Sequence, residues 1–298
     1  MKKLLFLLLL VLLPCAALAD LEVHFLDAGH GVCTILLCDG EVMLVDGGPA
    51  SSSDLVFARL RSLGVAEVKF AVATNPDADH VGGLPAAFHA AQVQTLLLPV
   101  ESHGGERYRV RTDKAAEMGA AARAAGEGET LALGGAEVTV LRQEMTLSLL
   151  VRYGAHTFLL CGDEGSQAGR VPPADVLRVS YAGAGSLGEV KGAAGSAYAV
   201  VSCAELVKSP DRAYMEWLLR RDVLPLCTDY VGDVVFRSDG IALTFATETY
   251  YVANRNSKVF HRMTCSSVGK MKESNKRIVY SCEQAELLEY RGCKNCSP

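Results

Sequence analysis

The chain has 298 residues, half of them hydrophobic, and a formal net charge of −5 at pH 7. This length is sufficient for one large domain, or for one large and one small domain. Beyond the first twenty residues no apolar stretch is long enough to span a membrane, which excludes an integral helical membrane protein.

The first residues have the pattern of a secretory signal peptide. Two lysines at Lys2–Lys3 precede an apolar run from Leu4 to Leu13, and the small residues Ala17 and Ala19 precede Asp20. We expect residues 1–19 to be a signal peptide that is cleaved after Ala19. The mature protein is then secreted or extracytoplasmic, in the periplasm or at the cell surface, with no membrane anchor left after cleavage.

Charge and cysteine density change along the chain. Residues 20–249 carry 18 Lys and Arg against 30 Asp and Glu, whereas residues 250–298 carry 9 against 4. Four of the nine cysteines of the mature chain crowd into the last 34 residues. We therefore predict a large acidic domain at 20–249 and a small basic domain at 250–298, and any polyanion should bind the second.

Periodicity predicts the elements of the large domain in chain order. Strands are expected at 21–27, 32–37, 42–46, 68–73, 95–100, 136–141, 147–153, 156–161, 176–179, 197–203 and 223–227, followed by a hairpin over 232–246. Helices are expected from Ser53 to about 63, from about 84 to 91, from about 111 to 125 and from about 211 to 220. Strand hairpins followed by strand–helix units, twice over, predict an α/β fold with two face-to-face sheets and outer helices.

One loop contains most of the reactive side chains. The expected strand 68–73 leads into Thr74–Gly83, where Asp77, Asp79 and His80 follow the carboxyl end of the strand. Two carboxylates and an imidazole on a tight loop can bind a divalent metal. Alternatively, Asp77 and Asp79 cap the helix that follows. These ten residues leave both interpretations open.

Several ordered motifs of residues 21–247 resemble the metallo-β-lactamase fold. They include Phe25–Gly31, Leu44–Gly48, Thr74–Gly83, Phe158–Asp163 and Asp175–Ser180. Within that superfamily the chain is most similar to the hydrolase domain of ComEC-like DNA-uptake proteins of the competence type. The resemblance implies an αββα sandwich, in the α/β (α+β) class, with a metal site at one edge of its sheets.

The resemblance also implies a site and a reaction. Asp79, His80 and Asp163 match metal-ligand positions of the family, Asp163 being the position that bridges two metals, and Asp77 matches a position where this subgroup often has Asp. Such metals activate a water as the nucleophile for phosphodiester hydrolysis. Asp79 and His80 are the residues expected to support catalysis.

The chain departs from the family pattern at several ligand positions. Asn75 stands where the family usually has His, and Tyr181–Ala184 stands where it has a His-His-Gly-Ser turn. Thr146 and Lys208–Pro210 replace two further family residues. At least two imidazole ligands are therefore absent, and the sequence leaves open one metal at Asp79, His80 and Asp163, or none.

The tail contains two close pairs of ligands. Three residues separate His261 from Cys265, and two separate Cys293 from Cys296. Two such pairs can form a closed tetrahedral zinc site, and a domain this small needs that stabilisation. We predict structural zinc with Cys282 outside the site; the alternative is a disulfide such as Cys265–Cys282.

This stretch resembles the zinc-binding module of Ada-type DNA repair proteins. The similarity covers Ser257–Cys265, Gln284–Glu286 and the final Cys-x-x-Cys, but His261 replaces the first Cys of that module. The alkyl-accepting role of that Cys therefore does not transfer. The basic side chains favour contact with nucleic acid, DNA above all, through phosphates.

Together these observations predict an exported metal-dependent hydrolase, of the nuclease or phosphodiesterase type if active, that acts on or binds DNA with a degenerate metal site. Two alternatives remain: a catalytically inactive nucleic-acid-binding protein that uses the basic zinc module, and a non-enzymatic envelope interaction protein.

Overall fold

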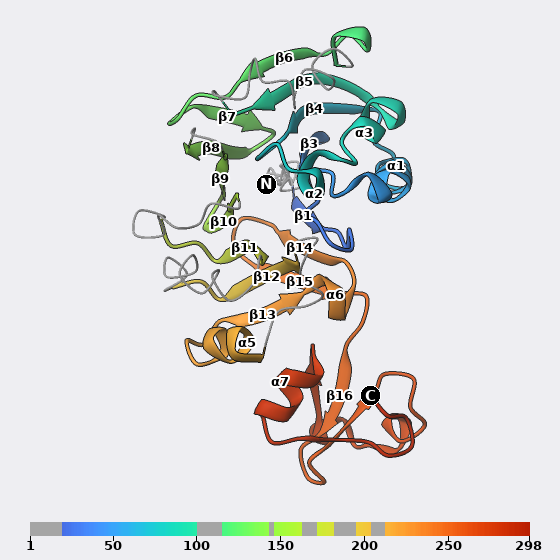
Figure 1. The fold of residues 1–298 in the computed structure, drawn as a ribbon. Helices are drawn as coiled ribbons and strands as arrows, with labels where there is room; N and C mark the ends of the chain where they lie inside the picture. Colours follow the sequence, from blue (N-terminus) through green and yellow to red (C-terminus); the bar gives the residue numbers. More distant parts are fainter. Residues whose placement is uncertain (1–19, 100–114, 143–145, 163–171, 182–194, 204–211) are drawn as a thin grey trace, which may run out of the picture.

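The computed structural model describes residues 20–99, 115–142, 146–162, 172–181, 195–203 and 212–298 (Figure 1). The expected signal peptide, Asp163 and the segment Lys208–Pro210 lie outside the described residues. Among the described residues, no helix is both long and apolar enough to cross a membrane.

Two large sheets form the body of the molecule. The first contains, in spatial order, β15 (Leu243–Thr247), β14 (Val234–Ser238), β1 (Leu21–Phe25), β2 (Thr34–Cys38), β3 (Glu41–Val45), β4 (Glu67–Val72), β5 (Gln92–Leu98) and β6 (Ala121–Ala124). The second contains β13 (Leu224–Cys227), β12 (Tyr198–Cys203), β11 (Val176–Tyr181), β10 (His156–Leu160), β9 (Ser148–Tyr153), β8 (Ala136–Arg142) and β7 (Thr130–Leu133).

Alternating side chains place the main core between these sheets. In β3, Met43 and Val45 belong to the inter-sheet core, whereas Val42 and Leu44 belong to the cluster on the outer face. The reason is the two-residue period of a strand, which sends successive side chains to opposite faces. Both faces of the strand are buried because helices cover the outer one.

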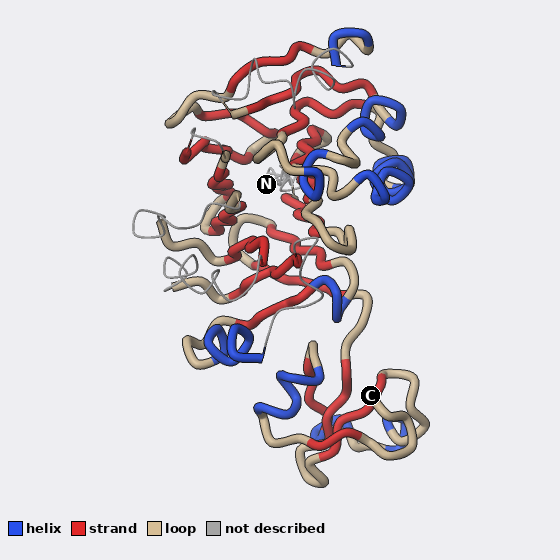
Figure 2. The backbone as a smooth tube through the Cα atoms, in the orientation of Figure 1, coloured by secondary structure: helices blue, strands red, loops and turns tan. Residues whose placement is uncertain are grey.

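Helices cover the outer faces. The helices of the first half are α1 (Ser53–Ser62), preceded by a 3₁₀ turn at Ala50–Ser52, α2 (Ala78–Val81) and α3 (Pro85–Ala90). Val56 and Leu60 of α1 and Phe88 of α3 pack on the first sheet. The second sheet is covered by α5 (Arg212–Leu219) and α6 (Thr228–Val231), with Tyr214 and Leu218 of α5 in its outer cluster. The predicted αββα sandwich is confirmed (Figures 1 and 2).

The helix expected from about 111 to 125 is wrong in its last part. Residues 121–124 form the edge strand β6, paired in parallel with β5 from Thr95↔Ala121 to Leu98↔Ala124. Gly119 has a φ of +79°, which ends the preceding turn, and the hydrogen bonds offered by the edge of β5 outweigh the helix propensity of the alanines. Residues 100–114 are outside the described residues.

The tail forms a small separate sheet. Its strands, in spatial order, are β18 (Lys276–Val279), β16 (Tyr251–Asn254), β17 (Val259–Arg262) and β19 (Arg291–Gly292). Helix α7 (Cys282–Leu287) supplies Ala285 to a core that also contains Ala253, Phe260, Val279 and Tyr290. Two 3₁₀ turns, Val268–Lys270 and Glu273–Asn275, complete the tail. The boundary near residue 249 stays a prediction.

Candidate metal sites

Two glycine pairs bring the segment after β3 against the segment after α2. A Cβ atom on Gly83 would lie 2.1 Å from the carbonyl oxygen of Gly47, and a Cβ on Gly47 would lie 2.4 Å from the backbone nitrogen of Leu84. The Gly83 amide donates to the Gly48 carbonyl at 2.9 Å. Only glycines permit backbones to approach this closely. The crossing fixes the loop Thr74–Gly83 against Asp46, the residue after β3.

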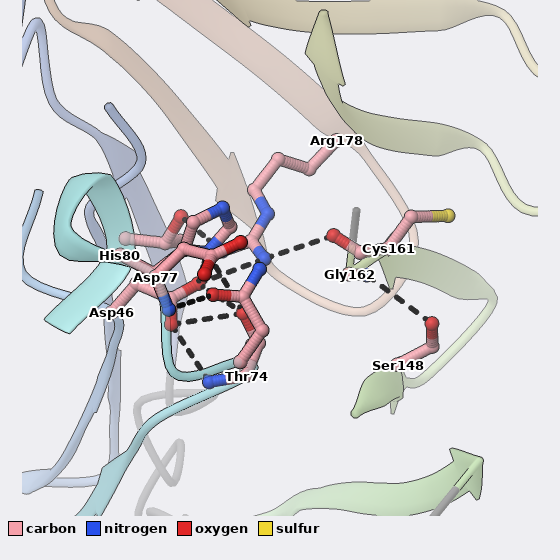
Figure 3. Close-up of polar contacts among 10 residues, drawn as sticks. Asp46, Thr74, Asp77, His80, Ser148, Cys161, Gly162 and Arg178 are labelled. Atoms are coloured by element: carbon pink, nitrogen blue, oxygen red, sulfur yellow. Dashed lines mark hydrogen bonds and ion pairs between the residues drawn. The ribbon is translucent and has the colours of Figure 1, made fainter. Parts of the chain in front are cut away.

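Asp46 is the centre of the polar cluster that results (Figure 3). Its carboxylate is fully buried and accepts hydrogen bonds from the Thr74 amide at 2.8 Å and from the Thr74 hydroxyl at 2.8 and 2.9 Å. The residue has a φ of +60°, a conformation that an L-residue adopts only when its surroundings fix it. The packing of the loop therefore determines where the carboxylate points.

His80 is oriented by this carboxylate. Its Nδ1 lies 3.1 Å from Asp46 Oδ2 and 3.0 Å from the Thr74 hydroxyl, and its side chain is fully buried. A carboxylate behind an imidazole is the usual outer-shell arrangement of a metal-ligating histidine. The nitrogen with which His80 would bind a metal is accordingly Nε2.

The side chains and backbone of Asn75, Asp77 and Asp79 make different contacts in the loop. Asn75, only 1% exposed, accepts the Asp77 amide through its side-chain oxygen at 2.9 Å, so its amide shapes the turn. Asp77 is the residue before α2, but its side chain makes no capping hydrogen bond. Asp79 is 9% exposed at the start of α2, and its carbonyl accepts the Val32 amide at 3.0 Å.

A buried arginine that sequence analysis had treated only as a strand residue completes the cluster. Arg178 on β11 is 1% exposed, and its Nη2 lies 3.1 Å from Asp46 Oδ2 and 3.0 Å from the Cys161 carbonyl. Its Nη1 donates to the Thr34 hydroxyl at 3.3 Å. A charge in the middle of an apolar strand was the signal available, because a buried charge requires a partner.

The expected ligands of the sandwich are thus only partly assembled in the described residues. Asp77, Asp79 and His80 share one short loop, but their ligand atoms do not form a cluster of the kind that a metal requires. Asp163 lies outside the described residues. Carboxylates and an imidazole backed by Asp46 suit a divalent metal chemically. The ligand role of these residues stays a prediction.

In the tail, four side chains converge. The ligand atoms of His261, Cys265, Cys293 and Cys296 all lie within 4.8 Å of one another, and this is the one group of three or more such ligands in the described part of the chain. Cys282 is not a member of the group, and neither it nor Cys265 is joined in a disulfide.

Strand register explains how distant residues meet there. β17 and β19 pair in parallel, with Val259 opposite Arg291 and Phe260 opposite Gly292, so the next residues, His261 and Cys293, leave the pair together. The Cys293 amide donates to the Phe260 carbonyl at 2.9 Å and holds this register. Two close pairs, 27 residues apart in sequence, thereby form one site.

The donor set fits zinc. The Nδ1 of His261 is buried without a hydrogen-bond partner among the described residues. A buried polar atom in this state is costly, and a bound metal relieves the cost. The Asn295 amide donates to Cys293 Sγ at 3.4 Å, a contact that stabilises a thiolate. Hydrogen bonds from the Ser267 backbone and from His261 lower the pKa of Cys265 to about 6. Three sulfurs and one imidazole are a structural zinc set.

Comparisons with known proteins agree with both parts. Residues 26–189 match the family model of the metallo-beta-lactamase superfamily, and residues 242–298 match the model of the metal binding domain of Ada. Zinc, the metal expected for the tail, is thereby confirmed. A search of curated proteins finds no significant match.

The chain is similar to several solved structures at low identity. The metallo-beta-lactamase fold protein YhfI from Bacillus subtilis is 13% identical with a TM-score of 0.52, and the alignment covers 73% of this chain and all of that one. Zn²⁺-bound PqqB from Methylobacterium extorquens is 14% identical over 66% of this chain and 85% of its own, with a TM-score of 0.49. A diphosphatase of the PhnP family is 14% identical over 64% and 89%, with a TM-score of 0.44.

YhfI supports the fold, and the family model covers more than half of the chain. The chain belongs to the metallo-β-lactamase superfamily, a family of metal-dependent hydrolases, and it ends in an Ada-type zinc-binding domain.

Proposed function

We propose that this protein is an exported DNA-binding hydrolase of the ComEC-like competence type. Its zinc module, defined as residues 250–298, binds the phosphates of DNA, and the sandwich hydrolyses phosphodiesters at the edge that carries Asp79 and His80. An Ada-type zinc domain is consistent with nucleic-acid interaction in general.

The observation that carries the binding proposal is a set of exposed cations in the zinc module that form no ion pair with any described residue. These side chains, which we call the free cations, are Arg255, Lys270, Lys272, Arg277, Arg291 and Lys294. Exposed, unpaired cations on a rigid fold neutralise phosphates and release counterions, and they read no sequence.

The remaining cations of the module support its structure. Lys258 lies over the Tyr290 ring at 4.9 Å, Arg262 donates to the Cys296 and Ser297 carbonyls at 3.2 and 3.0 Å, and Lys276 pairs with Glu273 at 2.6 Å. The division between structural and free cations makes the binding surface separable from the fold by mutation.

The hydrolytic part rests on the orientation of His80. Asp46 and Thr74 hold its Nδ1, so that Nε2 is the nitrogen for a metal, and Asp79 is the preceding residue of the same helix. A metal bound there supplies a hydroxide nucleophile near neutral pH. Asp79, His80 and the predicted ligand Asp163 would hold it.

Binding is tested by the salt dependence of affinity for duplex DNA. Replacing Arg277 and Arg291 with Glu should weaken binding by about tenfold or more and reduce the slope of log affinity against log salt by about 2. The matched control is Arg61→Glu, an exposed charge reversal on α1, which should change neither. Equal losses in both variants would contradict binding through the module.

Hydrolysis is tested with a DNA substrate and added Mn²⁺ or Zn²⁺. Metal-dependent cleavage that disappears in Asp79→Ala, while DNA affinity persists, is the expected result. Cleavage that survives in Asp79→Ala would reject this site.

Two observations favour a second candidate, a catalytically inactive DNA-binding protein. Asn75 stands where the family has a metal ligand, but its side-chain oxygen accepts the Asp77 amide within the same turn. The guanidinium of Arg178 neutralises the buried carboxylate of Asp46. DNA binding with no cleavage under any metal would establish this candidate in place of the hydrolase.

A further inference from the structure

The zinc module contacts the sandwich through an aromatic side chain. Tyr280, between β18 and α7, lies with its ring centre 5.3 Å from that of Phe245 on β15. Tyr280 is among the partly buried side chains that pack against the core between the two large sheets. Figure 1 shows α7 close to α5 of the sandwich, and residues of these two helices are in contact.

Phe245 connects Tyr280 to the aromatic centre of the sandwich. Its ring lies 5.2 Å from Tyr198 and 5.4 Å from Phe236, and Phe236 in turn lies 6.0 Å from Phe25. Burial, and to a lesser extent the neighbouring Tyr198, raise the pKa of Tyr280. The ring of Tyr280 is therefore partly buried against the sandwich.

Within the module, the position of Tyr280 depends on α7. The Tyr280 amide donates to the Gln284 side-chain oxygen at 2.7 Å, and the Gln284 amide donates to the Ser281 hydroxyl at 3.0 Å. This reciprocal cap fixes the start of α7 and the residue just before it.

The same helix packs on the residues that hold the zinc ligands. Ala285 of α7 shares a buried core with Phe260 and Tyr290. Phe260 directly precedes His261, and its carbonyl accepts the Cys293 amide at 2.9 Å. One continuous set of contacts thus leads from the zinc ligands through the module core and α7 to Tyr280.

We infer that Tyr280 and α7 form a docking surface whose partner is the β15–α5 region of the same chain, so that zinc bound by the module stabilises the sandwich. A module of this size has too small a core to stay folded without its metal. Loss of zinc therefore removes the support that Tyr280 gives to Phe245, at a distance from the ligands.

The single tryptophan of the chain makes this testable. Trp217 lies on α5 in the sandwich, so the fluorescent reporter of thermal unfolding belongs to the sandwich. Four mature full-length proteins form a double-mutant cycle: wild type, Cys293→Ser, Tyr280→Ala and the double variant. Zinc content is measured for each.

Cys293→Ser should lose zinc and lower the tryptophan-reported midpoint by about 4–8 °C. Tyr280→Ala should lower it by a similar amount while keeping zinc. The double variant should be close to Tyr280→Ala alone, because the ring contact through which zinc acts is already absent. Tyr280→Phe retains the ring and should restore the wild-type midpoint.

Ile278→Ala is the matched control, since it removes a 42% exposed side chain on β18, two residues before Tyr280 and outside the contact. If Tyr280→Ala also loses zinc, Phe245→Ala breaks the same ring contact from the sandwich side and replaces it in the cycle. An unchanged midpoint in zinc-free Cys293→Ser overturns the inference, and so do strictly additive shifts in the cycle.

Discussion

At the scale of single residues, a buried carboxylate organises the edge of the sandwich. Asp46 joins two segments that are far apart in sequence, because Thr74 and His80 of one loop and Arg178 of β11 all contact its oxygens. A buried charge is tolerated only when partners of this kind replace water. Its removal would leave the guanidinium of Arg178 buried without a counter-charge.

We expect Asp46→Asn to destabilise the protein by about 3 kcal/mol. Asn is the appropriate replacement because it keeps the shape and tolerates a positive φ. Urea unfolding followed by Trp217 fluorescence measures the loss, with the exposed Asp54→Asn on α1 as the control expected to stay within about 0.5 kcal/mol of wild type. A loss below about 1 kcal/mol for Asp46→Asn would show that Arg178 is satisfied without this carboxylate.

His24 gives a prediction for pH. Burial lowers the pKa of its imidazole from the ordinary 6.5, and the hydrogen bond with Glu22 at 2.9 Å only partly offsets this. The folded state then binds fewer protons than the unfolded state, so stability falls as pH drops below about 6.5. His24→Gln should flatten the denaturation midpoint between about pH 7 and 5, whereas His89→Gln, at an exposed position on α3, should leave the profile unchanged. A profile equally steep in His24→Gln would assign the loss to other groups.

At the scale of elements, the close approach of Gly47–Gly48 to Gly82–Gly83 sets the position of the loop Thr74–Gly83. The sequence predicted a loop at Thr74–Gly83, but its close approach to the residues after β3 is a tertiary contact. In the edge strand β6 a tertiary contact overrides the local preference. Its alanine-rich residues favour a helix locally, but they form a strand that pairs with β5.

We expect Gly83→Ala to cost about 3 kcal/mol, because its Cβ would meet the Gly47 carbonyl at 2.1 Å and backbone must move. A urea midpoint from far-ultraviolet circular dichroism measures this. Gly269→Ala is the control, since nothing lies within 4 Å of its added Cβ, and it should be nearly neutral. Similar midpoints for the two variants would mean that the crossing adjusts freely.

At the scale of the whole molecule, an acidic sandwich and a basic zinc module are joined by a short link and by the contact of Tyr280 with Phe245. The module supplies both the cations proposed for phosphate contact and a support for the sandwich. Metal content is the property that separates the two parts experimentally.

Elemental analysis of the protein should find about one zinc per molecule or more, and Cys293→Ser should lose this zinc whereas Asp79→Ala should keep it. A second metal that is lost in Asp79→Ala and kept in Cys293→Ser would show that the sandwich site is occupied. Zinc retained by Cys293→Ser would contradict the four-ligand site in the tail.

The sequence by itself determined the fold class, since two-residue alternation and turn signals such as Asp39–Gly40 are local properties of the chain. It also identified the two ligand pairs of the tail, because chelating pairs are close in sequence. Only the tertiary structure decided that the parallel register of β17 and β19 brings His261 to Cys293, that Arg178 neutralises Asp46 132 residues away, and that Tyr280 reaches the sandwich core. These contacts depend on how whole sheets and modules pack, and no local pattern of residues encodes that.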